Sequence, residues 1–221
     1  MRNRFYSHHR AIFHLFLAAL LFLATPVWAK DWHGLHNLGN VQLSEKISGL
    51  QKGLDQNPTD YEALKALGIA YHIKARKDPK EYTPRAVEFL SRAYEINKKD
   101  DETMCYLGSA TTMMAKTTWN PIKKMLYVNK GTGLMDKAVK KDPDNASVRM
   151  TRASNSKNLP SFLNRGEIAL EDFEHLAGLI EKNPKSLTSI KKKVYSNLAE
   201  LYTKAGDQAK AEKFRRLSEN L

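Results

Sequence analysis

Hydrophobic residues recur every three or four positions through most of this chain, which is the spacing of one face of an α-helix. The clearest short example lies over residues 41–57. Its apolar positions form a single stripe: Leu43, Ile47, Leu50 and Leu54. Asn57-Pro58 ends the stripe, because proline lacks a backbone N–H and disfavours helical geometry in the residue before it. The pattern predicts a lone helix over this segment.

A motif of small and large residues then returns along the chain. Leu67-Gly68 and Tyr71 are followed at helical spacing by Ala86, Leu90 and Ala93. Near the C-terminus Leu198-Ala199, Tyr202, Gly206-Asp207 and Ala211 repeat this order. The pattern resembles the tetratricopeptide repeat family, whose units are pairs of antiparallel helices. The resemblance implies an all-α solenoid in which the small residue lets two paired helices approach closely.

The resemblance divides the chain after the lone helix into four units, at about 58–100, 101–145, 146–188 and 189–221. We expect the third unit to be the least well packed, because Arg149 and Arg152 occupy positions that are usually large and apolar. In the first unit, Thr83 before Pro84 predicts a helix start, with threonine as N-cap and proline at the first helical position.

The units are longer than the family period of about 34 residues. The extra residues fall mostly between the two helices of a unit, at 74–82, 116–130 and 158–166. Long loops on one edge of the solenoid would form a rim or lid over its groove. The alternative is that the helices are longer, as the helical pattern from Asn120 to Lys141 indicates.

The first 29 residues have the features of a cleaved signal peptide. Arg2, Arg4 and Arg10 precede an apolar run that is shorter than the roughly 20 residues needed to span a bilayer. Val27-Trp28-Ala29 provides small residues at the cleavage site, so we expect a mature N-terminus at Lys30 and a periplasmic or secreted protein. Residues 30–40 have no helical period, which predicts a flexible or loosely docked arm.

The composition limits the function further. The formal net charge is +12, but the basic residues are spread over several predicted helices, and export argues against a nucleic-acid partner. Peripheral attraction to an anionic membrane surface stays open. The single cysteine, Cys105, excludes an intramolecular disulfide and is expected to be a buried apolar residue.

The family resemblance implies that a partner binds along the first helix of each unit. Carried over residue by residue, the binding positions include Lys65, Ile69 and His72, then Ser109, Thr112 and Met113, in the third unit Lys157, and in the fourth unit Lys193. This set mixes polar and apolar side chains, which suits a peptide or a partner helix.

Two apolar inserts are further candidates. Trp119 precedes a segment in which Met125 and Leu126 alternate with lysines, which predicts either an amphipathic helix packed on the next unit or an exposed membrane- or partner-binding element. Phe162 lies in the second insert. Exposure of both on the same edge would create a patch of interaction size.

No catalytic, metal or cofactor motif is found in the sequence. Glu171 and His175 are four residues apart on one helix face, and we expect them to form an ion pair rather than a metal site. The sequence therefore predicts a non-catalytic envelope scaffold without a cofactor, which binds a protein or peptide in its concave groove. The alternative is a soluble ligand-binding component of an envelope transport system, for which a closed pocket lined by Met113, Trp119 and Phe162 would be evidence.

Overall fold

The computed structural model describes residues 33–185 and 187–221, so the predicted signal peptide and cleavage site lie outside the described residues. Within these ranges the chain contains α-helices and short 3-10 segments and no strand. The helices are α1 (Asn40–Gln56), α2 (Tyr61–Lys74), α3 (Pro79–Ile96), α4 (Asp101–Met113), α5 (Pro121–Lys141), α6 (Ala146–Lys157), α7 (Gly166–Lys182), α8 (Thr188–Ala205) and α9 (Gln208–Glu219).

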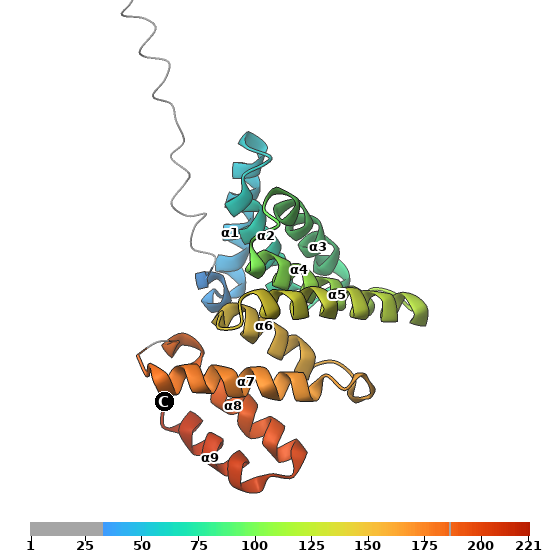
Figure 1. The fold of residues 1–221 in the computed structure, drawn as a ribbon. Coiled ribbons are helices and arrows are strands. Elements are labelled where there is room, and N and C mark those ends of the chain that lie inside the picture. The colour runs from blue at the N-terminus through green and yellow to red at the C-terminus, as the bar shows by residue number, and fades with distance from the viewer. Residues whose placement is uncertain (1–32, 186) are drawn as a thin grey trace, which may run out of the picture.

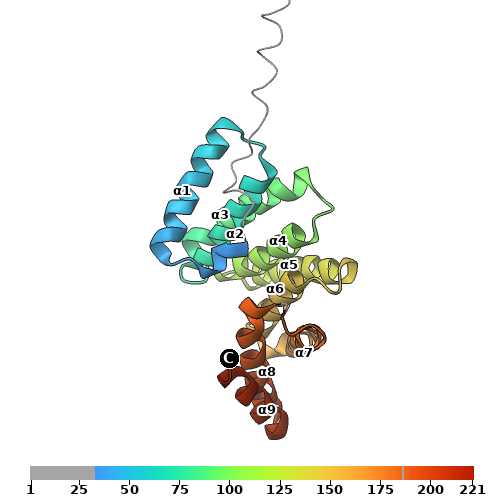
Figure 2. The same ribbon diagram turned by 90° about the vertical axis from the view of Figure 1, so that its left-hand side faces the viewer.

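The helices pack as consecutive pairs, α2 with α3, α4 with α5, α6 with α7, and α8 with α9, after the single helix α1. Figures 1 and 2 show these pairs following one another from α1 at the top to α9 at the bottom. Apolar residues between successive helices form three core clusters along this stack. The predicted all-α solenoid is confirmed.

The connections at 57–60, 97–100 and 142–145 are nearly identical four-residue turns, whereas the connection into α8 is longer and Leu187 before that helix makes no side-chain cap hydrogen bond. Asn57, Asn97 and Asp142 each end a helix with φ of −133° and ψ between 81° and 87°. Three residues later Asp60, Asp100 and Asn145 begin the next helix, and each side chain accepts hydrogen bonds from the first turn. Such capping satisfies backbone N–H groups that have no partner within the helix.

The connections inside the pairs differ from the sequence prediction. Helix α3 begins at Pro79, because the side chain of Asp78 accepts a hydrogen bond from the backbone N–H of Glu81, 3.1 Å away. The predicted start at Thr83-Pro84 is wrong, and Pro84 lies inside the helix. Helix α5 covers the range that the pattern from Asn120 predicted. Longer helices therefore account for much of the first two insertions, whereas 158–165 is a connection that contains a short 3-10 turn, η4 (Ser161–Leu163).

Two glycines allow the close helix pairing that the motif predicted. A Cβ atom added to Gly68 of α2 would lie 2.5 Å from Cγ of Leu90 in α3. One added to Gly108 of α4 would lie 2.6 Å from the carbonyl oxygen of Gly131 in α5. Both distances are shorter than carbon contacts allow, so only glycine fits without a shift of the paired helix.

The third unit is packed through a buried ion-pair cluster, contrary to the expectation that its arginines would weaken it. Asp172 of α7 is fully buried. It accepts hydrogen bonds from Nη1 of Arg149, at 2.7 Å, and from Nε and Nη2 of Arg152, both at 2.8 Å. The two guanidinium groups of α6 thus have a buried anionic partner on the next helix, which satisfies charges that would otherwise be costly to bury.

The N-terminal segment is docked rather than flexible over its described part. A 3-10 turn, η2 (His33–Asn37), precedes α1, and Leu35 is buried in the core of the first helices. The Arg76 guanidinium donates a hydrogen bond to Nδ1 of His36, and Nε2 of His36 lies 2.8 Å from the hydroxyl of Tyr106. These contacts attach the segment to Arg76, which follows α2, and to α4, so of the two alternatives for the arm, residues 33–39 show the docked one.

Candidate protein-binding face

The first helices of the four pairs, α2, α4, α6 and α8, carry most of the residues predicted to bind a partner. The structure buries five of these residues and leaves two partly exposed and two exposed. The buried residues are Lys65, Ile69, His72, Ser109 and Thr112; the partly exposed ones are Met113 and Lys157; the exposed ones are Trp119 and Phe162. The expectation that the inner positions form an open, accessible groove is therefore wrong for the first two units.

The polar side chains between α2 and α4 bind one another. Lys65 donates hydrogen bonds to Asp100 at 2.7 Å and to Glu102 at 3.0 Å. Burial alone would raise the pKa of Asp100, but the hydrogen bonds from Lys65 and Tyr61 hold it below its ordinary value. Asp100 is thus both the N-cap of α4 and the anion that fixes Lys65, which makes this lysine a structural residue.

His72 occupies the middle of the same contact. Its Nε2 lies 2.9 Å from Oγ of Ser109, and its ring packs edge-on against Tyr106. Burial, followed by the charges of Arg76 and His36, lowers the pKa of His72 to about 3. The side chain is therefore neutral at physiological pH and is enclosed by protein rather than presented to a ligand.

The polar contacts continue from α4 to α6 and from α6 to α8. Nδ2 of Asn155 donates hydrogen bonds to Thr112 at 2.5 Å and to Ser109 at 3.1 Å. Nζ of Lys157 donates to Glu200 of α8 at 2.5 Å. A row of side-chain contacts thus joins the four inner helices, with each residue bound to a residue of the adjacent unit.

Three basic residues remain accessible beside this row. Arg76 follows α2 and Lys193 lies on α8, and both are exposed, whereas Lys157 of α6 is partly exposed. Although the residue as a whole is exposed, partial desolvation of its ammonium group, and then the charges of Arg76 and Lys157, lower the pKa of Lys193. The charges of Arg76 and Lys157 thus act on Lys193 from separate units, and Lys157 itself is paired with Glu200. Sequence reasoning found Lys157 and placed Lys193 among the inner positions of the fourth unit, but it missed Arg76, which lies just outside the predicted binding positions.

We next consider the residues that could bind a metal ion or react as a nucleophile in the part of the chain that the structure describes. No group of three histidine, cysteine, aspartate or glutamate residues is placed to hold a metal ion there. Cys105 is buried, and burial raises the pKa of its thiol. Nε2 of His175 lies 2.7 Å from Asp144, and Glu171 lies near Arg149 instead, so the predicted Glu171–His175 pair is wrong.

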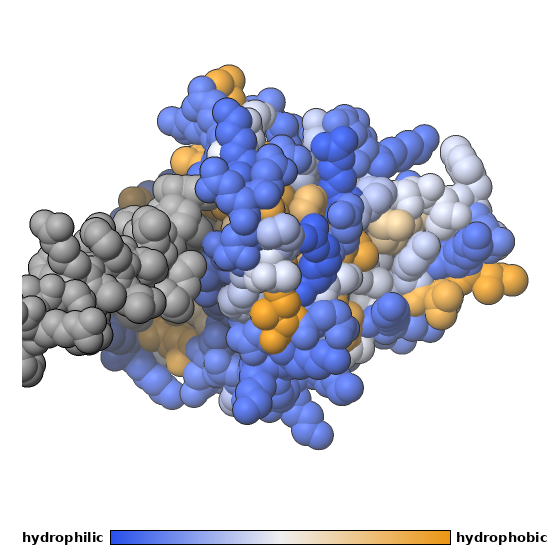
Figure 3. All heavy atoms as spheres, turned by 90° about the horizontal axis from the view of Figure 1, so that it is seen from above, coloured by the Kyte–Doolittle hydropathy of each residue, from blue (hydrophilic) through white to orange (hydrophobic). Residues whose placement is uncertain are grey.

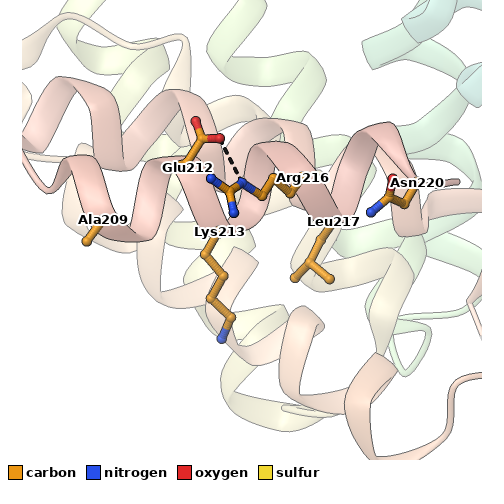
Figure 4. Close-up of a pocket in the computed structure, with 6 residues that line it drawn as sticks. All are labelled: Ala209, Glu212, Lys213, Arg216, Leu217 and Asn220. Atoms are coloured by element: carbon orange, nitrogen blue, oxygen red, sulfur yellow. Dashed lines mark hydrogen bonds and ion pairs between the residues drawn. The ribbon is translucent and has the colours of Figure 1, made fainter.

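Two open, shallow hollows lie on the surface of the described residues. One lies along a single face of α9, where the side chains of Glu212 and Arg216 are hydrogen-bonded to each other (Figure 4). Another lies between η2 and α1, at Leu35 and Gln42. Neither hollow contains the residues expected to line a ligand pocket.

The two apolar inserts are both exposed. Trp119 is 88% exposed and Phe162 is 72% exposed. They lie in the connections between the two helices of consecutive pairs, which places them on the same edge of the solenoid. They therefore do not enclose a pocket with Met113, and of the two arrangements proposed for the first insert the exposed one is observed.

None of the described helices is both long and apolar enough to cross a membrane. No family model matches the sequence, and no curated protein matches it.

Comparison with solved structures identifies the fold. The TPR protein TTC0263 of Thermus thermophilus superposes with a TM-score of 0.61 at 16% identity, over 80% of this chain and 81% of that one. MamA from AMB-1 superposes with a TM-score of 0.52 at 20% identity, over 88% of this chain and 100% of that one. Identities this low support a shared fold and no more. The chain has a tetratricopeptide-type fold, an all-α solenoid of antiparallel helix pairs.

Proposed function

We propose that this chain is an exported, non-catalytic scaffold that binds an acidic segment of a partner protein on the inner side of its solenoid. The observation that carries the proposal is that Arg76 and Lys193 are exposed in separate units, and that the charges of Arg76 and Lys157 act on Lys193. Lys157 is already paired with Glu200, whereas Arg76 and Lys193 would gain from an anionic partner, which gives electrostatic complementarity at the interface.

The fold and the inner row of contacts support this role. Solenoids bind extended partners along a continuous surface, because each repeat adds a similar element beside the last one. Here the polar contacts between adjacent inner helices hold that surface in one arrangement, so little side-chain ordering is required when a partner binds. Of the residues predicted from the sequence, Lys157 is accessible enough to take part directly.

Export remains a proposal that rests on the sequence of residues 1–29. The basic start, the short apolar run and the small residues before Lys30 support removal of this segment in the envelope of a bacterium. N-terminal sequencing of the protein from the envelope fraction should return Lys30. Recovery of Met1 would contradict cleavage and favour a retained leader.

Site-specific crosslinking in cells tests the binding face. A photoreactive amino acid at Lys193 should give a discrete crosslinked partner, whereas the same group at Lys99, in a turn between pairs, should not. The crosslinked segment of the partner, identified by mass spectrometry, should be rich in aspartate and glutamate.

Charge reversal tests the chemistry of the same face. Arg76→Glu with Lys193→Glu should abolish the crosslink at the neighbouring exposed Ser196. Lys98→Glu with Lys99→Glu changes the net charge equally and should leave it intact. Equal loss in both variants would mean that overall charge acts, and no loss in either would refute the proposed face.

A further inference from the structure

The N-terminal end of α5 stands clear of the other helices. Residues 119–126, which we term the α5 tip, are all exposed. Figure 1 shows this end of α5 extending to the right beyond its neighbours, and the view from above in Figure 3 shows hydrophobic atoms at the same extremity of the molecule. The next residue that α5 buries is Val128.

The α5 tip is apolar on one side. Ile122, Met125 and Leu126 are spaced so that they share one helix face, and Trp119 lies immediately before the helix. Trp119, Ile122 and Leu126 are 88%, 79% and 63% exposed. Large apolar side chains gathered at such exposure are unusual on a protein surface and mark an interaction site.

The charged residues of the α5 tip itself are all basic. Lys123 and Lys124 flank its apolar face, and no aspartate or glutamate occurs between Glu102 and Asp136. The Nζ atoms of Lys80 and Lys124 lie 5.9 and 6.0 Å from the centre of the Trp119 ring. Trp119 is therefore the apolar centre of a basic surface that α3 and α5 build together.

We infer that the α5 tip docks on the surface of an anionic lipid bilayer. Apolar side chains that enter the boundary between headgroups and acyl chains, with lysines at the level of anionic headgroups, define an interfacial helix. Tryptophan prefers this boundary because its ring is amphipathic. A projecting, convex tip fits a deformable lipid surface without any matching hollow. The inference does not rest on the proposed partner-binding face.

The charges disfavour a second copy of the chain as the occupant. A symmetric pairing of two tips would bring Lys123 and Lys124 of both copies together, and no acidic residue of the segment could neutralise them. An anionic headgroup layer neutralises the same lysines.

The fluorescence of Trp119 tests the inference locally in the full chain. The chain has three tryptophans, so Trp28→Phe with Trp32→Phe leaves Trp119 as the single reporter. On vesicles of phosphatidylglycerol and phosphatidylcholine its emission should shift to shorter wavelength, and lipids brominated near the top of the acyl chain should quench it. On phosphatidylcholine alone both changes should be largely absent.

Matched variants in the same background separate the two contributions. Ile122→Ser with Leu126→Ser should weaken the quenching response by about tenfold or more, because apolar burial is lost. Val41→Ser, which alters another exposed apolar residue on α1, should leave it unchanged. Lys123→Gln with Lys124→Gln should remove the preference for anionic vesicles, whereas Lys98→Gln with Lys99→Gln should not.

Several results would overturn the inference. Trp119 emission that is unaffected by anionic vesicles, even when the chain sediments with them, would mean that another segment binds lipid. A shift that depends on protein concentration and not on lipid would assign the α5 tip to self-association. Equal quenching on neutral and anionic vesicles would exclude the role of the lysines.

Discussion

Replacement of Asp172 by alanine should strongly destabilise the second half of the solenoid. Asp172 is fully buried and accepts three short hydrogen bonds from Arg149 and Arg152. Removal of one partner from a buried ion pair costs about 3–5 kcal/mol, because the remaining charge is left uncompensated.

The size of this loss of stability depends on which hydrogen-bond acceptors Arg149 and Arg152 keep after Asp172 is replaced. Arg149 keeps a hydrogen bond to the carbonyl of Pro143, at 2.5 Å, and Arg152 keeps one to Asp136, at 3.2 Å. Neither guanidinium is left without an acceptor, so we expect a loss of about 3 kcal/mol, the lower end of the range. This is a large part of the roughly 5–15 kcal/mol that stabilises an average domain.

Urea unfolding followed by far-ultraviolet circular dichroism measures this loss. Glu171→Ala is the control, because Glu171 is exposed and lies 3.5 Å from Arg149, and its removal should change stability by less than about 1 kcal/mol. Arg149→Met, Arg152→Met and Asp172→Leu combined should restore stability to near the original, since an apolar replacement of a buried cluster is often neutral. An Asp172→Ala protein as stable as the original would refute the assigned ion-pair cluster.

Three further changes test the contacts between helices. Gly108→Ala should cost about 1–3 kcal/mol in thermal or urea unfolding, because its Cβ would press on the carbonyl of Gly131; an unchanged midpoint would contradict the close crossing. Lys65→Ala should cost about 1–3 kcal/mol by leaving Asp100 without its cation, a loss expected to shrink as Asp100 is protonated at low pH. Because the pKa of His72 is lowered to about 3 in the folded state, the unfolded chain binds the proton first, so stability should fall as the pH drops from about 6.5 toward 3, by at most about 1.4 kcal/mol per pH unit. His72→Gln should flatten this part of the stability curve; an identical slope in the variant would show that other groups produce it.

The fold could be predicted from the sequence because its determinants are local and periodic. Gly68 and Gly108 each occupy a position in a helix pair where the partner helix leaves no room for a side chain. The helical stripes around them define which faces meet. These features recur at similar places in each unit, so weak signals reinforce one another along the chain.

The side-chain partners could not be predicted, because they depend on contacts between helices that the sequence pattern does not encode. Arg149 and Arg152 appeared unfavourable as single residues, and their partner Asp172 lies on the next helix. Lys65 and His72 were expected to face a partner, but α4 supplies their partners instead. The acidic residue Asp100 before α4 could be predicted from the sequence as a helix N-cap. That it also binds Lys65 follows only from the packing of α2 against α4.

The solenoid has two edges, one formed by the turns between helix pairs and the other by the connections within pairs, and the proposed binding residues are not distributed equally between them. Turns between pairs repeat the same backbone geometry at Asn57, Asn97 and Asp142, because each turn sets how one unit stacks on the next. Connections within pairs differ from one another in length and form, and in the first two pairs the close crossing at a glycine already fixes the two helices. Sequence variation is therefore tolerated on this second edge. Arg76 of the proposed partner-binding face follows α2 there, and Trp119 of the proposed lipid-binding tip precedes α5 there. Evolution of a new partner for this fold should accordingly alter the within-pair edge while leaving the between-pair turns intact.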